Sequence, residues 1–134
     1  MTASRFRELE VWQLAMQLAR TVYELTAAFP REERYGLTAQ LQRAAVSIPS
    51  NIAEGNARSS LKDYTRFGSM ALGSTAEVQT QLLLSRNLGL AAEADSAAAS
   101  ELCDRVRQML ARLHQALCRK LESESRVPSP ESRI

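Results

Sequence analysis

Apolar residues recur at intervals of three and four along four long stretches of this chain, and this spacing constrains the fold more than any other feature. The spacing places apolar side chains on one side of an α-helix, which repeats every ~3.6 residues. Ala and Leu contribute 38 of the 134 residues, whereas Val, Ile and Thr contribute 16, a balance that favours helix over strand. We therefore predict an all-α fold.

The apolar stretches and their end signals predict a single helical domain over residues 1–122. Phe29 precedes a proline and ends the first helix, Ser60 offers a hydroxyl cap to the third, and Gly89 ends it. Short connections favour an antiparallel up-down-up-down four-helix bundle. Residues 123–134 have no apolar period and are predicted to form a flexible C-terminal tail. The first predicted helix covers about residues 8–29 and the fourth about residues 94–122. The second begins between residues 33 and 37 and ends near 56, and the third begins at 59 or 60 and ends at 87.

The charge balance excludes strong global attraction to polyanions. The net charge is +2, too small to draw the whole molecule to nucleic acid or an anionic membrane. Arg outnumbers Lys by 15 to 2, which suits contacts with phosphate or carboxylate groups. The sequence has no apolar run of about 18 residues and no apolar signal-peptide core, so we expect a cytoplasmic protein without a membrane partner.

Residue types for catalysis or metal binding are scarce. Cys103 and Cys118 lie about 22 Å apart along one predicted helix, too far for a disulfide within the chain. His114 is the only histidine, which excludes a His-rich metal site, although it neighbours Cys118 on the helix surface. Since no phosphate-binding glycine loop or nucleophile elbow is present, we expect no enzymatic activity, no metal and no cofactor.

Pro49 interrupts the second predicted helix. It removes one backbone donor and crowds the carbonyl of Ala45, which costs roughly 3 kcal/mol in a straight helix and predicts a bend. Ser47, Ser50 and Asn51 surround the proline and are candidates to bond the freed carbonyl directly or through water. Both a functional bend and a simple packing adjustment are compatible with this pattern.

A line of polar residues follows the second helix, about 115° from its apolar side at ~3.6 residues per turn. We call this line the polar stripe. It is either an ordinary exposed face or the lining of a groove or interface, in which Arg43 and Arg58 bind an anion or a carboxylate and Asn51 adapts its hydrogen bonds. Glu77 and Gln81 of the third helix are expected to join it. Its members are Gln40, Arg43, Ser47, Asn51, Glu54 and Arg58.

The third predicted helix has more apolar surface than one bundle needs. One set of its residues, which includes Phe67, Ala71, Val78 and Leu82, faces the core. A second set lies about 100° away at ~3.6 residues per turn, and we call it the outer stripe. Because a helix that is apolar around much of its circumference is covered on several sides, we predict that another subunit buries this stripe. The outer stripe consists of Leu61, Thr65, Leu72, Ala76 and Leu83.

Several of these segments together resemble a known signature. The chain closely resembles the bacterial four helix bundle protein family, also called 23S rRNA intervening-sequence proteins. The resemblance covers about residues 6–90, and the fourth helix matches by pattern alone. It rests on the segments Leu9–Trp12, Glu33–Thr38, Gln40, Arg43–Gly55, Ala71–Ser74, Glu77 and Thr80–Leu82.

The resemblance implies a cytosolic bacterial protein whose four-helix bundles assemble into a ring-shaped homopentamer with no enzymatic activity. We therefore expect a non-enzymatic assembly or interaction scaffold. A related branch of accessory proteins of diversity-generating retroelements is strongly basic and associates with nucleic acid. The alternative prediction is thus a nucleic-acid-binding accessory protein that uses Arg43, Arg58 and Arg66, although a charge of +2 departs from that branch.

Overall fold

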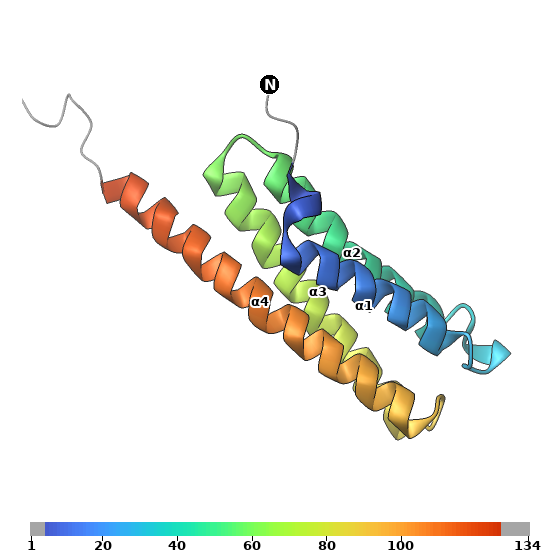
Figure 1. Cartoon of the computed structure of the whole chain (residues 1–134). Coiled ribbons are helices and arrows are strands. Elements are labelled where there is room, and N and C mark those ends of the chain that lie inside the picture. The colour runs from blue at the N-terminus through green and yellow to red at the C-terminus, as the bar shows by residue number, and fades with distance from the viewer. Residues whose placement is uncertain (1–4, 127–134) are drawn as a thin grey trace, which may run out of the picture.

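Helices account for nearly all of the chain in a computed structural model, which describes residues 5–126 (Figure 1). Over this range the chain forms four α-helices and two short 3-10 helices, and no strand. The prediction of an all-α chain is confirmed. The elements are η1 Phe6–Glu8, α1 Glu10–Thr26, η2 Arg31–Glu33, α2 Leu37–Ala57, α3 Leu61–Asn87 and α4 Glu93–Arg126.

The C-terminal ends of α1 and α4 differ from the sequence prediction. α1 is shorter than residues 8–29, because the chain after Thr26 tightens into a turn in which the Phe29 amide donates to the Thr26 carbonyl at 3.0 Å. α4 continues to Arg126, past the predicted end at residue 122, and an ion pair of 3.2 Å joins Glu122 to Arg126 on this last turn. Residues 127–134 of the predicted tail lie outside the described residues.

The two ends of α3 follow the prediction. The Ser60 hydroxyl accepts a hydrogen bond of 3.1 Å from the Asp63 amide and so caps the first turn. At the other end Gly89 has a φ of +66°, a left-handed conformation that glycine adopts without strain. The Leu90 amide then donates to the Ser85 carbonyl at 3.0 Å, which closes the helix.

Each helix packs against two others, as α1 with α2, α2 with α3, α3 with α4, and α4 with α1. The α1–α2 and α3–α4 connections lie at one end of the molecule, and the α2–α3 connection lies at the other (Figure 1). The end of α4, drawn in red, projects past the α2–α3 connection. This arrangement gives the four helices one shared interior.

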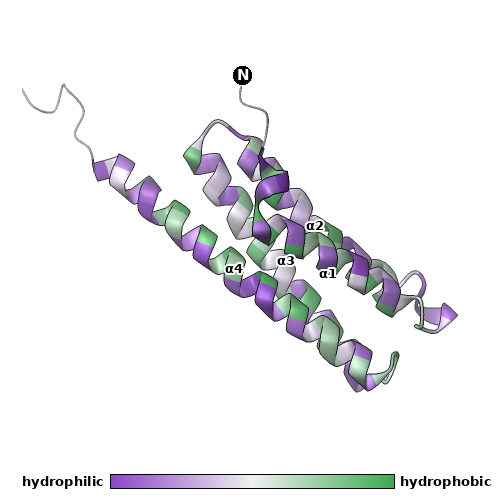
Figure 2. Cartoon of the chain, in the orientation of Figure 1, coloured by the Kyte–Doolittle hydropathy of each residue, from purple (hydrophilic) through white to green (hydrophobic). Residues whose placement is uncertain are grey.

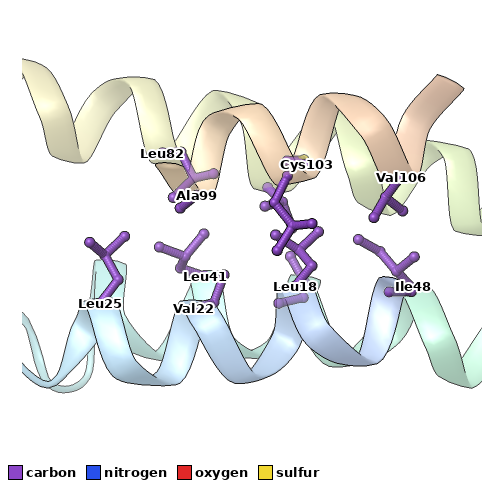
Figure 3. Packing of buried hydrophobic residues seen from close by; sticks show 14 of the residues in the cluster. Leu18, Val22, Leu25, Leu41, Ile48, Leu82, Ala99, Cys103 and Val106 are labelled. Carbon is purple, nitrogen blue, oxygen red and sulfur yellow. The ribbon is translucent and has the colours of Figure 1, made fainter. Parts of the chain in front are cut away.

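The core occupies that interior. In Figure 3, Leu18 and Val22 of α1 point toward Ala99, Cys103 and Val106 of α4. The predicted core stripe of α3 is buried as well, since Phe67 is 6% exposed and Ala71, Val78 and Leu82 are fully enclosed. The remaining fully enclosed large residues are Leu41, Ile48, Ile52, Thr75, Ser85 and Leu110.

Glycines bring α3 close to its neighbours at two points. A Cβ atom on Gly55 of α2 would lie 2.7 Å from the Cβ of Phe67, closer than two such carbons approach. A Cβ on Gly68 of α3 would lie 3.3 Å from Cδ2 of His114 on α4. Because glycine has no side chain, Gly55 permits the close spacing of α2 and α3. Gly68 does the same for α3 and α4, where the contact is less tight.

Candidate interaction surface

The polar stripe lies along the side of α2 that turns toward α3. Ser47 and Asn51 in its middle are half-buried. Its other four members, Gln40, Arg43, Glu54 and Arg58, are exposed. α2 continues as one helix through the buried Pro49, so the stripe keeps its register along the whole element. The expected bend at Pro49 stays a prediction.

Hydrogen bonds use the middle of the stripe to join α2 to α3. The hydroxyl oxygens of Ser47 and Ser74 lie 2.6 Å apart, and Ser47 also lies 2.8 Å from the Ala44 carbonyl. The Asn51 side-chain amide donates to the Ser47 carbonyl at 2.8 Å. Ser47 and Asn51 thus bond directly to the carbonyls of Ala44 and Ser47, and neither bonds directly to the Ala45 carbonyl that Pro49 frees.

A groove of about 420 Å³ runs between α2 and α3 beside these serines. Arg43 on one wall and Glu77 on the other are both exposed, so the groove presents one positive and one negative group. The Oε1 atom of Gln81 is buried and has no hydrogen-bond partner among residues 5–126. The structure thus brings part of the stripe together with Glu77 and Gln81. The lining residues are Gln40, Arg43, Ala44, Ser47, Ser74, Glu77 and Gln81.

The two arginines of the stripe differ in their surroundings. Arg58 pairs with Glu54 at 2.9 Å, and its guanidinium lies 5.1 Å from the centre of the Phe67 ring. Arg66 of α3 lies 4.6 Å from the same ring and 3.8 Å from an Asp63 oxygen. For Arg43, no carboxylate of the described chain lies within 4.0 Å. Of the three arginines proposed for nucleic acid, Arg43 alone is therefore without a compensating carboxylate in this range.

The outer stripe of α3 is covered unevenly. Leu72 is half-buried and packs against the core, and Leu61 and Thr65 are also half-buried. Ala76 and Leu83 are exposed, with Leu83 at 55%.

Two further leucines of this region are exposed. Leu84 at the end of α3 is 47% exposed and Leu88 just beyond it is 57% exposed. Neither residue belongs to the predicted outer stripe. The run of leucines at residues 82–84 is a sequence signal for Leu84, because three consecutive helical residues cannot all lie on one face; Leu88 lies one turn after Leu84.

The two cysteines have opposite environments. Burial raises the pKa of the Cys103 thiol to about 12, and its Sγ lies 3.7 Å from the Thr75 carbonyl oxygen in the core. Cys118 is exposed, and its Sγ lies 3.8 Å from both ring nitrogens of His114.

No cluster of three or more His, Cys, Asp or Glu side chains suited to a metal ion occurs within residues 5–126. In the same range no helix is both long and apolar enough to cross a membrane.

The sequence of the chain matches one known protein family. The family model of the 23S rRNA-intervening sequence protein matches residues 7–112. The chain belongs to this family. The polar stripe, the groove and the exposed leucines of α3 lie inside the matched segment. Cys118 and the last turns of α4 lie beyond it. No protein with a curated description matches the chain.

Proposed function

We propose that this chain is a non-enzymatic, cytoplasmic assembly protein. In this proposal it folds as an antiparallel up-down-up-down four-helix bundle, and five copies form a ring through the outward side of α3. The observation that carries the proposal is the exposed apolar surface at the end of α3. Leu83, Leu84 and Leu88 each leave about half of their surface in water in a single chain.

The energy available from these leucines supports association. Burying a whole leucine side chain contributes roughly 1.5–3 kcal/mol, so covering the exposed half of each contributes about 1 kcal/mol. Adjacent helical residues point about 100° apart, so Leu83 and Leu84 face different sides of α3. One chain therefore offers apolar contacts in two directions, as a closed ring of identical subunits requires.

Gly73 supports a close approach of another molecule to α3. It lies in the interior of the helix, where glycine costs about 1 kcal/mol relative to alanine. A Cβ atom at this position would meet nothing within 4 Å, and the residue is exposed. Packing within one chain therefore does not require glycine at this position. A second helix that packs closely against α3 here would require it.

Light scattering coupled to size exclusion tests the assembly. We expect the parent protein to have five times the 14.9 kDa mass of one chain, and the variant L83E/L84E to form smaller species with an unchanged helical circular dichroism spectrum. The control variant V46E/M16E places two charges at similarly exposed apolar positions, 41% and 46%, on α2 and α1, and keeps the parent mass. Leu72 is not substituted, because it packs against the core.

Two results contradict the proposal. One is a parent protein that scatters as a single chain at micromolar concentration, and the other is an L83E/L84E variant that keeps the parent mass. The nucleic-acid alternative at Arg43, Arg58 and Arg66 has less support, because carboxylates accompany two of these three arginines.

A further inference from the structure

The C-terminal half of α4 holds a concentration of positive charge that the assembly proposal does not use. Residues 105–121 include five Arg and Lys residues and no Asp or Glu. Arg105, Arg112 and Arg119 recur every seven residues, so they lie along one side of the helix, and all three are exposed. We call them the arginine row. Figure 2 shows hydrophilic residues recurring along α4 to its end.

The arginines of the row differ from most arginines on the helices in their lack of paired carboxylates. Ion pairs of 4.0 Å or less join Arg20 to Glu24 and Arg107 to Asp104, among others. Within residues 5–126 no such pair involves the row. Glu10 and Glu101 line the same surface hollows as Arg105. The neighbouring Asp104 carboxylate accepts hydrogen bonds from Arg107 and Gln108.

The dimensions of the row suit an extended ligand. Seven helical residues advance about 10.5 Å, so the row spans about 21 Å of the helix. A single small anion contacts only one of these positions, whereas a polymer of anions contacts all of them. Gln115 is exposed beside the row and adds an amide donor, whereas the Gln108 amide donates to the Asp104 carboxylate at 2.9 Å.

The opposite side of α4 argues against a membrane as the partner. A helix that binds a bilayer surface inserts an apolar face into the acyl region. In α4 that face is already used inside the molecule, because Leu102, Val106, Leu110 and Leu117 are buried. The row itself is entirely cationic and polar.

We propose that the arginine row of α4 binds the phosphate backbone of a nucleic acid. Arginine presents a planar fork of donors that matches two phosphate oxygens at once. Phosphate groups repeat along a nucleic-acid strand, so one strand can contact successive arginines of the row. The row belongs to one chain and lies on a different helix from the exposed leucines. The proposal therefore does not depend on the number of subunits.

Fluorescence anisotropy with the full-length protein tests the row. The probes are a labelled single-stranded RNA and a labelled duplex DNA, each about 20 nucleotides or base pairs long, at salt concentrations from about 50 to 200 mM. The test variant is R105Q/R112Q/R119Q. The matched control R20Q/R31Q/R34Q removes the same charge from exposed positions on α1 and in the α1–α2 connection. Circular dichroism and light scattering of both variants establish that fold and assembly are unchanged.

We expect the row variant to bind at least about tenfold more weakly at ~50 mM salt. We also expect the plot of log binding constant against log salt concentration, whose gradient we call the salt slope, to be shallower by about 2 on single-stranded RNA. The control keeps the parent slope. The conservative variant R105K/R112K/R119K retains most of the slope because it retains the charge. A larger loss on RNA than on duplex DNA, or the reverse, identifies which nucleic acid the row prefers.

Three outcomes overturn the proposal. They are a parent protein that binds neither probe at ~50 mM salt, equal losses in the row variant and the control, and displacement of the probes by polyglutamate as effectively as by unlabelled RNA. The last outcome indicates an acidic protein surface as the partner. If R105Q/R112Q/R119Q fails to fold, the same measurement on the single variant R112Q, with an expected slope change of about 0.7, decides the question.

Discussion

Replacing Gly55 with alanine tests whether the spacing of α2 and α3 is set by a missing side chain. The new methyl group would lie 2.7 Å from Phe67 Cβ and 3.1 Å from Tyr64 Cδ1. Carbon atoms pack at about 3.5–4.0 Å, so the two helices must separate by about 1 Å at this point. Neither Cβ atom can rotate away, because each is fixed to its backbone.

The magnitude follows from two opposing terms. Overpacking costs about 1–3 kcal/mol, and the rigid contact at Gly55 places this substitution near the upper end. Alanine is favoured over glycine within a helix by about 1 kcal/mol. The net loss is about 2 kcal/mol of unfolding free energy. For 134 residues this corresponds to a fall of about 7 °C in the unfolding midpoint.

Thermal unfolding followed by circular dichroism measures this effect, with Gly68→Ala as the matched control. Gly68 is also buried between two helices, but its new methyl would meet Cδ2 of His114 at 3.3 Å. Because that atom belongs to a side chain that can shift, we expect G68A to keep or slightly raise the midpoint. The reasoning fails if G55A is as stable as the parent, or if both variants lose the same stability.

Two further predictions concern the cysteines and one ion pair. Burial raises the Cys103 pKa to about 12, so this thiol should not react with iodoacetamide at about pH 8 while the chain is folded. We expect one label per folded chain, at the exposed Cys118, and two labels after denaturation. Two rapid labels on the folded protein would contradict this. The Arg86 hydrogen bond lowers the pKa of Glu93, so Glu93 stabilises the fold at neutral pH, and this contribution disappears as the pH falls through its folded-state pKa. Glu93→Gln should therefore lower the unfolding midpoint at about pH 7, with a difference that shrinks toward about pH 3. A difference that grows in acid would refute this assignment.

The sequence predicted most of the helical organisation because its signals are local. The Ser60 cap and the Gly89 stop act within one helical turn, and the structure confirms both. The end of α1 was misplaced, since Thr26 and the residues after it form a tighter turn that apolar spacing does not distinguish from an α-helix. The end of α4 was also misplaced, because Arg126 lies in a segment without apolar period.

The candidate surface was predicted in its members but not in its internal contacts. The stripe on α2 followed from helical spacing alone. The expected proximity of Glu77 depended in addition on how α2 and α3 pack, and the structure places Glu77 beside the same groove as Arg43. The pairing of Arg58 with Glu54 depends on side-chain conformation, which an i, i+4 spacing permits but does not require. The contact between Ser47 and Ser74 joins residues 27 positions apart.

The sequence by itself determined that this chain is helical, which residues face the core and where the arginines of α4 recur, because each of these depends on spacing within one helix. Only the tertiary structure decided that Leu72 packs inward while Leu83 stays exposed, and that Gly55 must accommodate Phe67. The physical reason is that these facts depend on the distance and rotation between helices. Side chains from separate elements set both only when they pack together.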